Sequence, residues 1–158
     1  MYEKIENPLY IQFEIGDTPK GKARARTVTK NGRTWSYTPK GTKEFEESIK
    51  NAFLSNENVE KVQQYDGPVK VWIRAYFEPP KSLSKVKRED LLNKHSEYLK
   101  KPDGDNIAKA VCDALNGVAY KDDCSVYELM VDKYYRESSG LLITIIYDEL
   151  SAKEVHNA

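Results

Sequence analysis

The sequence predicts a single domain of the α+β class, in which a mixed or antiparallel sheet packs with about three helices. Strand-like alternation of apolar and polar residues recurs along the chain, interrupted by segments with helical spacing. The chain has 158 residues, the size of one ordinary domain. We expect the domain to occupy residues 1–150 and the tail, residues 151–158, to be frayed.

The N-terminal half is expected to contain one strand, one hairpin and one helix. Apolar and polar residues alternate over residues 8–16, which is typical of a half-buried strand. Asn31 followed by Gly32 favours a hairpin turn. Four apolar residues then recur at helical spacing: Phe45, Ile49, Ala52 and Phe53. Three acids suit the first turn of this helix, where the helix dipole is positive: Glu44, Glu46 and Glu47.

The C-terminal half is expected to contain strands and helices. Ser82 or Ser84 is expected to cap a helix over residues 82–95, and Gly117 to end a helix over residues 106–116. The expected elements are a strand over residues 69–77, a basic helix over 82–95, a helix over 106–116, and strands over 126–135 and 141–147.

The sequence excludes several classes of protein. Its longest apolar run, residues 141–147, is far too short to span a membrane, and residues 1–4 do not resemble a signal peptide. We therefore expect a cytoplasmic protein with no membrane partner. Cys112 and Cys124 have neither metal-binding nor redox spacing and are expected to stay reduced.

Charge is distributed unevenly although the net charge is zero. Residues 18–43 contain eight lysines and arginines and no acid, and residues 81–101 are basic on balance. Residues 103–132 carry seven acids against Lys109 and Lys121. This segregation suits a protein that holds an anionic polymer and also binds cations.

Acids gather at both ends of the helix expected over residues 106–116. Asp103 and Asp105 flank a glycine at its start, and Asp122 and Asp123 follow its end. If the next strand runs back beside the helix, the two groups of carboxylates meet. Three close carboxylates resist joint ionisation, and a bound hard cation such as Mg²⁺ removes that penalty. The pattern therefore predicts a metal site that acts on phosphate.

The same helix is expected to have a buried stripe and an exposed stripe. The buried stripe contains Ile107, Ala110, Val111, Ala114 and Leu115. The exposed stripe contains Asp105, Lys109, Cys112 and Asn116. Lys109 follows Asp105 by one turn, where its ammonium would bind the scissile phosphate or the attacking water.

Simpler explanations of these residues stay open at this point. Asp105 is a possible N-cap, with Asp103 in the preceding turn. Asp105 and Lys109 have the spacing of an ordinary i,i+4 ion pair. Asp122 and Asp123 also suit a solvated turn.

Further motifs accompany this segment. The central one reads Lys101-Pro102-Asp103-Gly104-Asp105-Asn106 and continues through Lys109, Asp113-Ala114-Leu115-Asn116-Gly117 and Asp122-Asp123. Others are the basic residues 18–26, Tyr37-Thr38-Pro39 and the serine- and lysine-rich residues 80–85. Together they resemble the RusA family of Holliday junction resolvases, in the form of Gram-positive bacteria and their phages. The resemblance spans about residues 9–147; alanines at positions 23 and 25 depart from it.

The resemblance implies a RusA-like fold and a homodimeric, Mg²⁺-dependent endonuclease that cuts symmetrically related strands of four-way DNA junctions. Mn²⁺ is an alternative metal. The essential acids of the family match Asp103, Asp105 and Asp123, which are therefore expected to bind the metal, and its essential lysine matches Lys109; all four are expected to be catalytic. Asp122 is the neighbour of the third acid and is easily confused with it.

Basic residues outside this helix are expected to contact DNA phosphates. They are Lys20, Lys22, Arg24, Arg26, Arg33, Lys85, Lys87 and Arg88. For those in residues 82–95, a solvated helix face is the alternative. Trp35 and Tyr37 either stack on opened bases or pack within their own hairpin.

Two other functions stay open. One is a nuclease of the same chemistry that acts on other branched DNA. The other is a catalytically silent DNA-binding protein of the same fold, which the presence of all four candidate catalytic residues disfavours.

Overall fold

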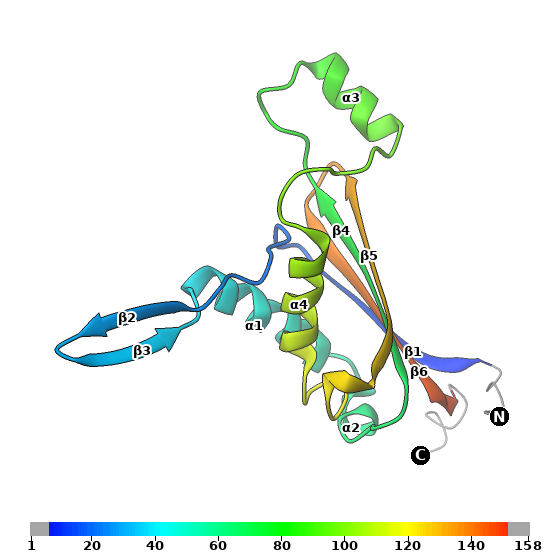
Figure 1. The fold of residues 1–158 in the computed structure, drawn as a ribbon. Helices are drawn as coiled ribbons and strands as arrows, with labels where there is room; N and C mark the ends of the chain where they lie inside the picture. Colours follow the sequence, from blue (N-terminus) through cyan, green and yellow to red (C-terminus); the bar gives the residue numbers. More distant parts are fainter. Residues whose placement is uncertain (1–6, 152–158) are drawn as a thin grey trace.

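A four-stranded sheet with helices on one face forms the body of the protein (Figure 1). The structure is a computed structural model that describes residues 7–151. The sheet contains β1 (Pro8–Ile15), β6 (Gly140–Ser151), β4 (Val69–Phe77) and β5 (Val126–Tyr135), in that order. β6 is antiparallel to both of its neighbours, whereas β4 and β5 are parallel. The sheet is therefore mixed, and the α+β prediction is confirmed.

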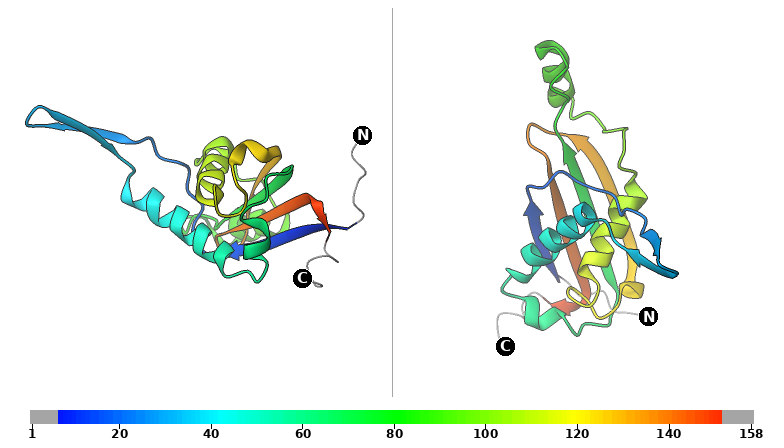
Figure 2. Two further views of the ribbon diagram at one scale, coloured as in Figure 1. Left: turned by 90° about the horizontal axis from the view of Figure 1, so that it is seen from below. Right: turned by 90° about the vertical axis from the view of Figure 1, so that its left-hand side faces the viewer.

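Two helices provide most of the cover of the sheet. α1 (Lys40–Leu54) contacts β1, and α4 (Gly104–Leu115) contacts β5 and α1. The short α2 (Val59–Val62) follows α1. α3 (Lys85–Asn93) projects beyond the end of the sheet and buries no residue (Figures 1 and 2). No helix in residues 7–151 has the length and apolar character needed to cross a membrane.

The core lies between these helices and the sheet. All five residues of the buried stripe predicted for α4 are buried, which confirms that prediction. Phe45, Ile49 and Phe53 of α1 are also buried, as their spacing predicted. The predicted tail, residues 151–158, lies outside the described residues except for Ser151, which ends β6.

Several boundaries differ from the sequence-based expectation. α1 begins at Lys40, after Pro39 at the N-cap, so its first turn contains no acid and the placement of three glutamates there was wrong. α4 begins at Gly104, two residues earlier than expected. The one-turn elements α2 and η1 (Asp123–Ser125) were not predicted, because they are shorter than the window in which periodicity is visible.

The caps and turns follow their local sequence. Ser84 caps α3, and its Oγ accepts a hydrogen bond from the Lys87 backbone N–H at 3.3 Å. Gly117 follows α4 with φ +71°, a value that favours glycine. Asn31 and Gly32 both have positive φ and join β2 (Arg26–Lys30) to β3 (Arg33–Tyr37). The hairpin predicted from this pair is therefore confirmed.

Phe53→Ala tests the packing of α1 on the sheet. Phe53 is fully buried and meets Phe13 edge to face, with ring centroids 5.9 Å apart. We expect a loss of about 3–5 kcal/mol in the free energy of unfolding, measured by urea denaturation, because a cavity replaces the ring. Leu54→Ala, on the exposed side of the same helix, should cost less than about 1 kcal/mol. Equal losses in the two variants would contradict this packing.

Candidate active site

The acidic segment predicted to bind metal begins α4. Asp103 is the N-cap residue, yet its side chain makes no capping hydrogen bond. Asp105 lies inside the first turn, so it is not the N-cap. Among residues 7–151, the side chains of Asp103, Asp105 and Lys109 form no hydrogen bond or ion pair. Neither the capping interpretation nor the i,i+4 interpretation therefore accounts for these exposed charges.

A lysine of β5 holds the segment that leads into α4. The Lys133 Nζ donates hydrogen bonds to the carbonyl oxygens of Lys100, at 2.7 Å, and Pro102, at 3.0 Å. Tyr98 completes the attachment, since its N–H donates to the Lys133 carbonyl at 2.9 Å and its hydroxyl to the Lys101 carbonyl at 3.0 Å. These contacts fix the start of α4 against the sheet. Sequence reasoning did not identify Lys133 or Tyr98, because their role depends on a strand that is distant in sequence.

The second pair of acids lies in a turn fixed to the other end of α4. The Asp123 N–H donates to the Asn116 side-chain oxygen at 3.0 Å. The Asp122 carboxylate accepts a hydrogen bond from the Cys124 N–H at 3.0 Å, which lowers the pKa of Asp122. Partial desolvation, followed by the nearby Asp122 and Asp113 carboxylates, raises the pKa of Asp123. Asp122 therefore has a structural partner, whereas the charge of Asp123 is disfavoured by its surroundings.

The two pairs of acids do not meet within one chain. Asp105 and Asn116 are eleven residues apart, which at about 1.5 Å per residue separates them by roughly 16 Å along the helix axis. β5 does run beside α4. The residue of β5 near the start of α4 is Val131, which lies well along the strand from Asp123. Its Cγ1 is 3.8 Å from the position that a Cβ on Gly104 would occupy. Residues 7–151 contain no group of three or more carboxylate, thiol or imidazole side chains that could hold a metal ion. The expected convergence of carboxylates is therefore not found.

Lys22 joins the basic N-terminal segment to both helices. Its Nζ is paired with the carboxylates of Glu46 in α1 and Asp113 in α4, the latter at 3.1 Å. Its backbone N–H donates to the Asn106 carbonyl at 2.9 Å. Glycine precedes it at position 21, where a Cβ would lie 2.9 Å from the Asn106 Cβ. This segment is therefore packed closely on the first turn of α4.

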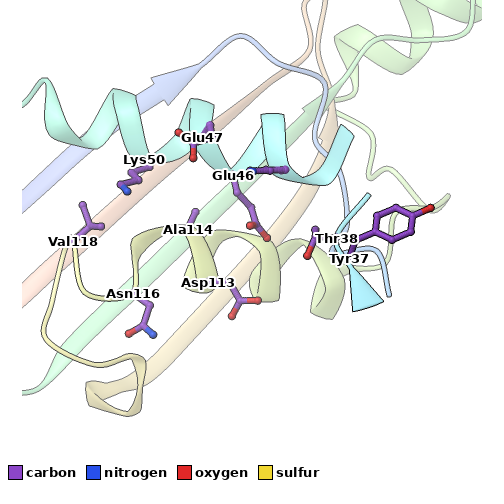
Figure 3. Close-up of a pocket in the computed structure, with 10 residues that line it drawn as sticks. Tyr37, Thr38, Glu46, Glu47, Lys50, Asp113, Ala114, Asn116 and Val118 are labelled. Atoms are coloured by element: carbon purple, nitrogen blue, oxygen red, sulfur yellow. The ribbon is translucent and has the colours of Figure 1, made fainter. Parts of the chain in front are cut away.

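The two carboxylates decide the protonation of Lys22. Partial burial by itself would lower the pKa of Lys22, but the hydrogen bonds and charges of Glu46 and Asp113 outweigh it and raise the pKa. Figure 3 shows the Glu46 side chain extending from α1 toward α4, the helix that carries Asp113. Lys22 was predicted to contact DNA phosphate. In this structure its charge already has two partners.

An open cleft lies beside this ion pair. It has a volume of about 500 Å³ and extends between α1 and α4 to Tyr37 and Thr38, at the foot of the hairpin (Figure 3). Its charged lining is mixed and contains Lys43, Glu46, Glu47, Lys50 and Asp113. This mixture distinguishes the cleft from the basic surface expected to hold DNA.

The other basic residues predicted to contact DNA lie on two separate projections. Arg24, Arg26 and Arg33 are exposed in or beside the β2–β3 hairpin, and Lys20 is exposed before it. Lys85 and Lys87 are exposed on α3. Arg88 is half-buried and donates to the Pro79 carbonyl at 3.2 Å. The hairpin and α3 leave the body of the domain in different directions, with α4 in the body (Figures 1 and 2).

The fold and the site define a mixed α+β domain with acids at both ends of α4 and exposed basic residues on the β2–β3 hairpin and on α3. Comparison with known sequences gives the family. Residues 17–146 match the family described as endodeoxyribonuclease RusA, so the chain belongs to the RusA family. An uncharacterized protein of Bacillus subtilis (strain 168), YqaN, is 33% identical over 137 residues, which cover 85% of this chain and 94% of the relative.

Lys22→Met tests the bridge between the helices. We expect a loss on the order of 1–2 kcal/mol in the free energy of unfolding, since two carboxylates lose a partly buried partner. The pKa of Lys22 is raised above the ordinary lysine value of 10.5. Its contribution to the free energy of unfolding is therefore fully present below pH 10.5 and is lost only as the pH rises through the higher pKa of the folded state. Thermal or urea denaturation should therefore give the same loss at pH 7 and pH 9.

Two variants serve as controls for this prediction. Lys20→Met removes an exposed lysine of the same segment and should leave stability nearly unchanged. Asp113→Asn in the Lys22→Met background should restore part of the loss, because it removes one of the unpaired charges. A loss of equal size in Lys20→Met would show that the effect does not come from the bridge.

Proposed function

We propose that this protein is a Mg²⁺-dependent endonuclease that cuts symmetrically related strands of four-way DNA junctions as a homodimer. The single observation that carries the proposal is the row of Asp103, Asp105 and Lys109 along α4, whose side chains have no partner among residues 7–151, in a member of an endodeoxyribonuclease family. Exposed charges without internal partners are available for a metal ion and a phosphate.

Asp103 and Asp105 fit a hard cation. Carboxylate oxygens are the ligands that Mg²⁺ prefers, and Mg²⁺ is commonly held by only one or two carboxylates together with water and substrate phosphates. A group of three protein ligands is therefore not required. When bound, the cation supplies an activated water and stabilises negative charge on the phosphate oxygens. Mn²⁺ should substitute for Mg²⁺, because it accepts the same oxygen ligands.

The protein supplies position and charge around this pair. Lys109 lies one turn after Asp105 on the exposed side of α4, where its ammonium would bind the scissile phosphate. Lys133 and Tyr98 hold the segment before Asp103 and so fix the start of the helix. Asp123 is assigned to catalysis at the opposite end of α4.

Phosphate binding is assigned to the exposed cations outside the site. Of the predicted set, Lys20, Arg24, Arg26, Arg33, Lys85 and Lys87 are exposed. Their separation on two projections suits a substrate larger than a single duplex. Lys22 and Arg88, which have internal partners, contribute mainly to structure under this proposal.

The homodimer follows from the substrate. A four-way junction has paired cleavage points related by two-fold symmetry, and one site makes one incision. Two copies related by a two-fold axis present two identical sites. The sheet face away from the helices suits such a contact, because it exposes Tyr10, Trp72 and Met130.

The central experiment is cleavage of labelled DNA with and without Mg²⁺. Four-way junctions, three-way or flapped DNA and intact duplex of matched sequence should be compared. Paired, symmetrical cuts in the four-way junction alone support the proposal. Equal cutting of flaps would indicate a nuclease for other branched DNA, and binding without cutting would indicate a silent DNA-binding protein. A cytoplasmic location is part of the proposal and needs a separate test.

Substitution of the acids tests the assignment of the metal. Asp103→Asn and Asp105→Asn should each abolish junction cleavage and strongly weaken Mn²⁺ binding to the free protein, measured by electron paramagnetic resonance. Asp123→Asn should abolish cleavage but keep Mn²⁺ binding without DNA, since it lies at the other end of α4. Lys109→Ala should slow cleavage with metal binding intact. Junction affinity should persist in all three Asp→Asn variants, because fewer negative charges do not weaken a contact with phosphate.

Two outcomes would contradict this assignment. Full cleavage by any Asp→Asn variant would remove that residue from the site. An equal loss of Mn²⁺ affinity in Asp123→Asn would show that the three carboxylates form one site in solution.

Two neighbouring residues of β5 test the dimer. Met130 and Leu129 are equally exposed, at 47%, but alternate residues of a strand face opposite sides of the sheet. Met130→Lys should give a mass near one chain in sedimentation equilibrium at micromolar concentration, because it places a charge in the proposed contact. Leu129→Lys should remain dimeric. A wild-type protein that stays at the mass of one chain with a junction bound would overturn the dimer.

A further inference from the structure

The β2–β3 hairpin has two chemically different faces. Directly paired residues of an antiparallel hairpin share a face, and successive residues alternate. The pairs on one face are Arg26 with Tyr37, Val28 with Trp35, and Lys30 with Arg33. The pairs on the other face are Thr27 with Ser36 and Thr29 with Thr34. One face is thus cationic and aromatic, and the other contains only hydroxyl groups.

The hydroxyl face is satisfied within the hairpin. The Thr27 and Ser36 side-chain oxygens are 3.1 Å apart, and those of Thr29 and Thr34 are 3.0 Å apart, so each pair is hydrogen-bonded. This face has no charge and no large side chain. It stiffens the two strands against each other and is a poor candidate for binding an anionic partner.

The cationic face is open to a partner. Trp35 is 47% exposed and Tyr37 is 43% exposed, so the hairpin does not bury its own aromatic rings. Val28, paired with Trp35 across the hairpin, is half-buried. The alternative interpretation, in which the aromatic side chains pack only within the hairpin, does not account for this exposure.

The hairpin also stands away from the domain. The chief contacts of β2 and β3 are with each other, and they extend from the body beyond the N-terminal end of α1 (Figures 1 and 2). The arm therefore contributes little to the core. An exposed arm with a tryptophan, a tyrosine and three cations on one face has a surface suited to recognition.

We propose that this face of the β2–β3 hairpin stacks on unpaired bases at the branch point of DNA while its cations bind the flanking phosphates. The inference rests on the proposed function and names the part of the substrate that the arm reads. Charge complementarity favours nucleic acid over a protein partner, because residues 26–37 of the hairpin contain Arg26, Lys30 and Arg33 and no acid. Intact duplex offers phosphates but few exposed base faces, whereas a branch point offers both.

The aromatic side chains distinguish this proposal from phosphate binding alone. Lys30, Arg33 and Arg26 are sufficient to bind any DNA backbone, and that contact would not separate a junction from a duplex. Stacking of a base on an aromatic ring requires an opened base and tolerates any sequence. Trp35 should therefore contribute to selectivity for branched DNA, and the arginines and lysine should contribute to affinity for all DNA.

Trp35→Ala and the matched control Thr34→Ala test the proposal. The two residues are adjacent and exposed, and they lie on opposite faces of the same strand. Dissociation constants should be measured for a four-way junction and for a duplex of matched sequence, with Ca²⁺ in place of Mg²⁺ to limit cleavage. Trp35→Ala should weaken junction binding roughly five- to a hundredfold, the range expected for one stacked base, and duplex binding less than about twofold. Thr34→Ala should change neither.

A fluorescence measurement checks the contact directly. The chain contains two tryptophans, so the emission of Trp35 is obtained as the difference between wild-type protein and Trp35→Phe, which leaves Trp72 and the proposed dimer contact unchanged. The Trp35 emission should be quenched by the junction and little affected by the duplex. Equal losses of affinity for both DNAs in Trp35→Ala, or an unquenched Trp35, would overturn the stacking proposal.

The remaining outcomes separate the two proposals. If wild-type protein prefers the junction and Trp35→Ala keeps that preference, the hairpin proposal is wrong and the proposed function stands. If wild-type protein shows no preference for branched DNA, the proposed function fails and the hairpin proposal with it. If Trp35→Ala changes the oligomeric mass but not DNA affinity, the hairpin is an arm between copies of the chain, and the stacking proposal is overturned.

Discussion

Burial of one stripe of α4 against α1 and β5 orients every polar residue on that helix. Ile107, Ala110 and Val111 are buried there, so Asp105 and Lys109 must face solvent. A helix is rigid over this length, and its ends cannot approach each other. The same packing that exposes the first two acids therefore keeps Asp123 at the far end. Asp123 therefore cannot share a metal ion with Asp103 and Asp105 of the same chain in this structure.

The helix start is fixed from two sides by residues that are distant in sequence. Lys133 of β5 binds the carbonyl oxygens that precede Asp103. Lys22 binds the Asn106 carbonyl through its backbone and the Asp113 carboxylate through its side chain. The candidate site thus lies where the sheet, the N-terminal segment and α4 meet. Rigid support of this kind holds the carboxylates in place without engaging them in internal bonds.

The basic residues serve two purposes that a count of charges does not separate. Lys22 is enclosed by carboxylates and acts as a structural cation, whereas Arg26 and Arg33 are exposed on the hairpin. The backbone contact of Lys22 also holds the chain against α4 just before the hairpin begins. The arm can therefore extend from a well-fixed base while remaining almost free of the domain.

The sequence by itself determined the local features of this protein. Alternation predicted the strands, Asn31-Gly32 the hairpin, and the apolar spacing the buried stripe of α4, because these signals depend on residues close together in the chain. The acids and Lys109 were also selected as candidate site residues from local density and motif. The tertiary structure decided how far apart the acids lie, which lysines are paired and what holds the helix start. Those properties arise from contacts between α1, α4 and β5, whose partners are far apart in sequence and leave no periodic signal in it.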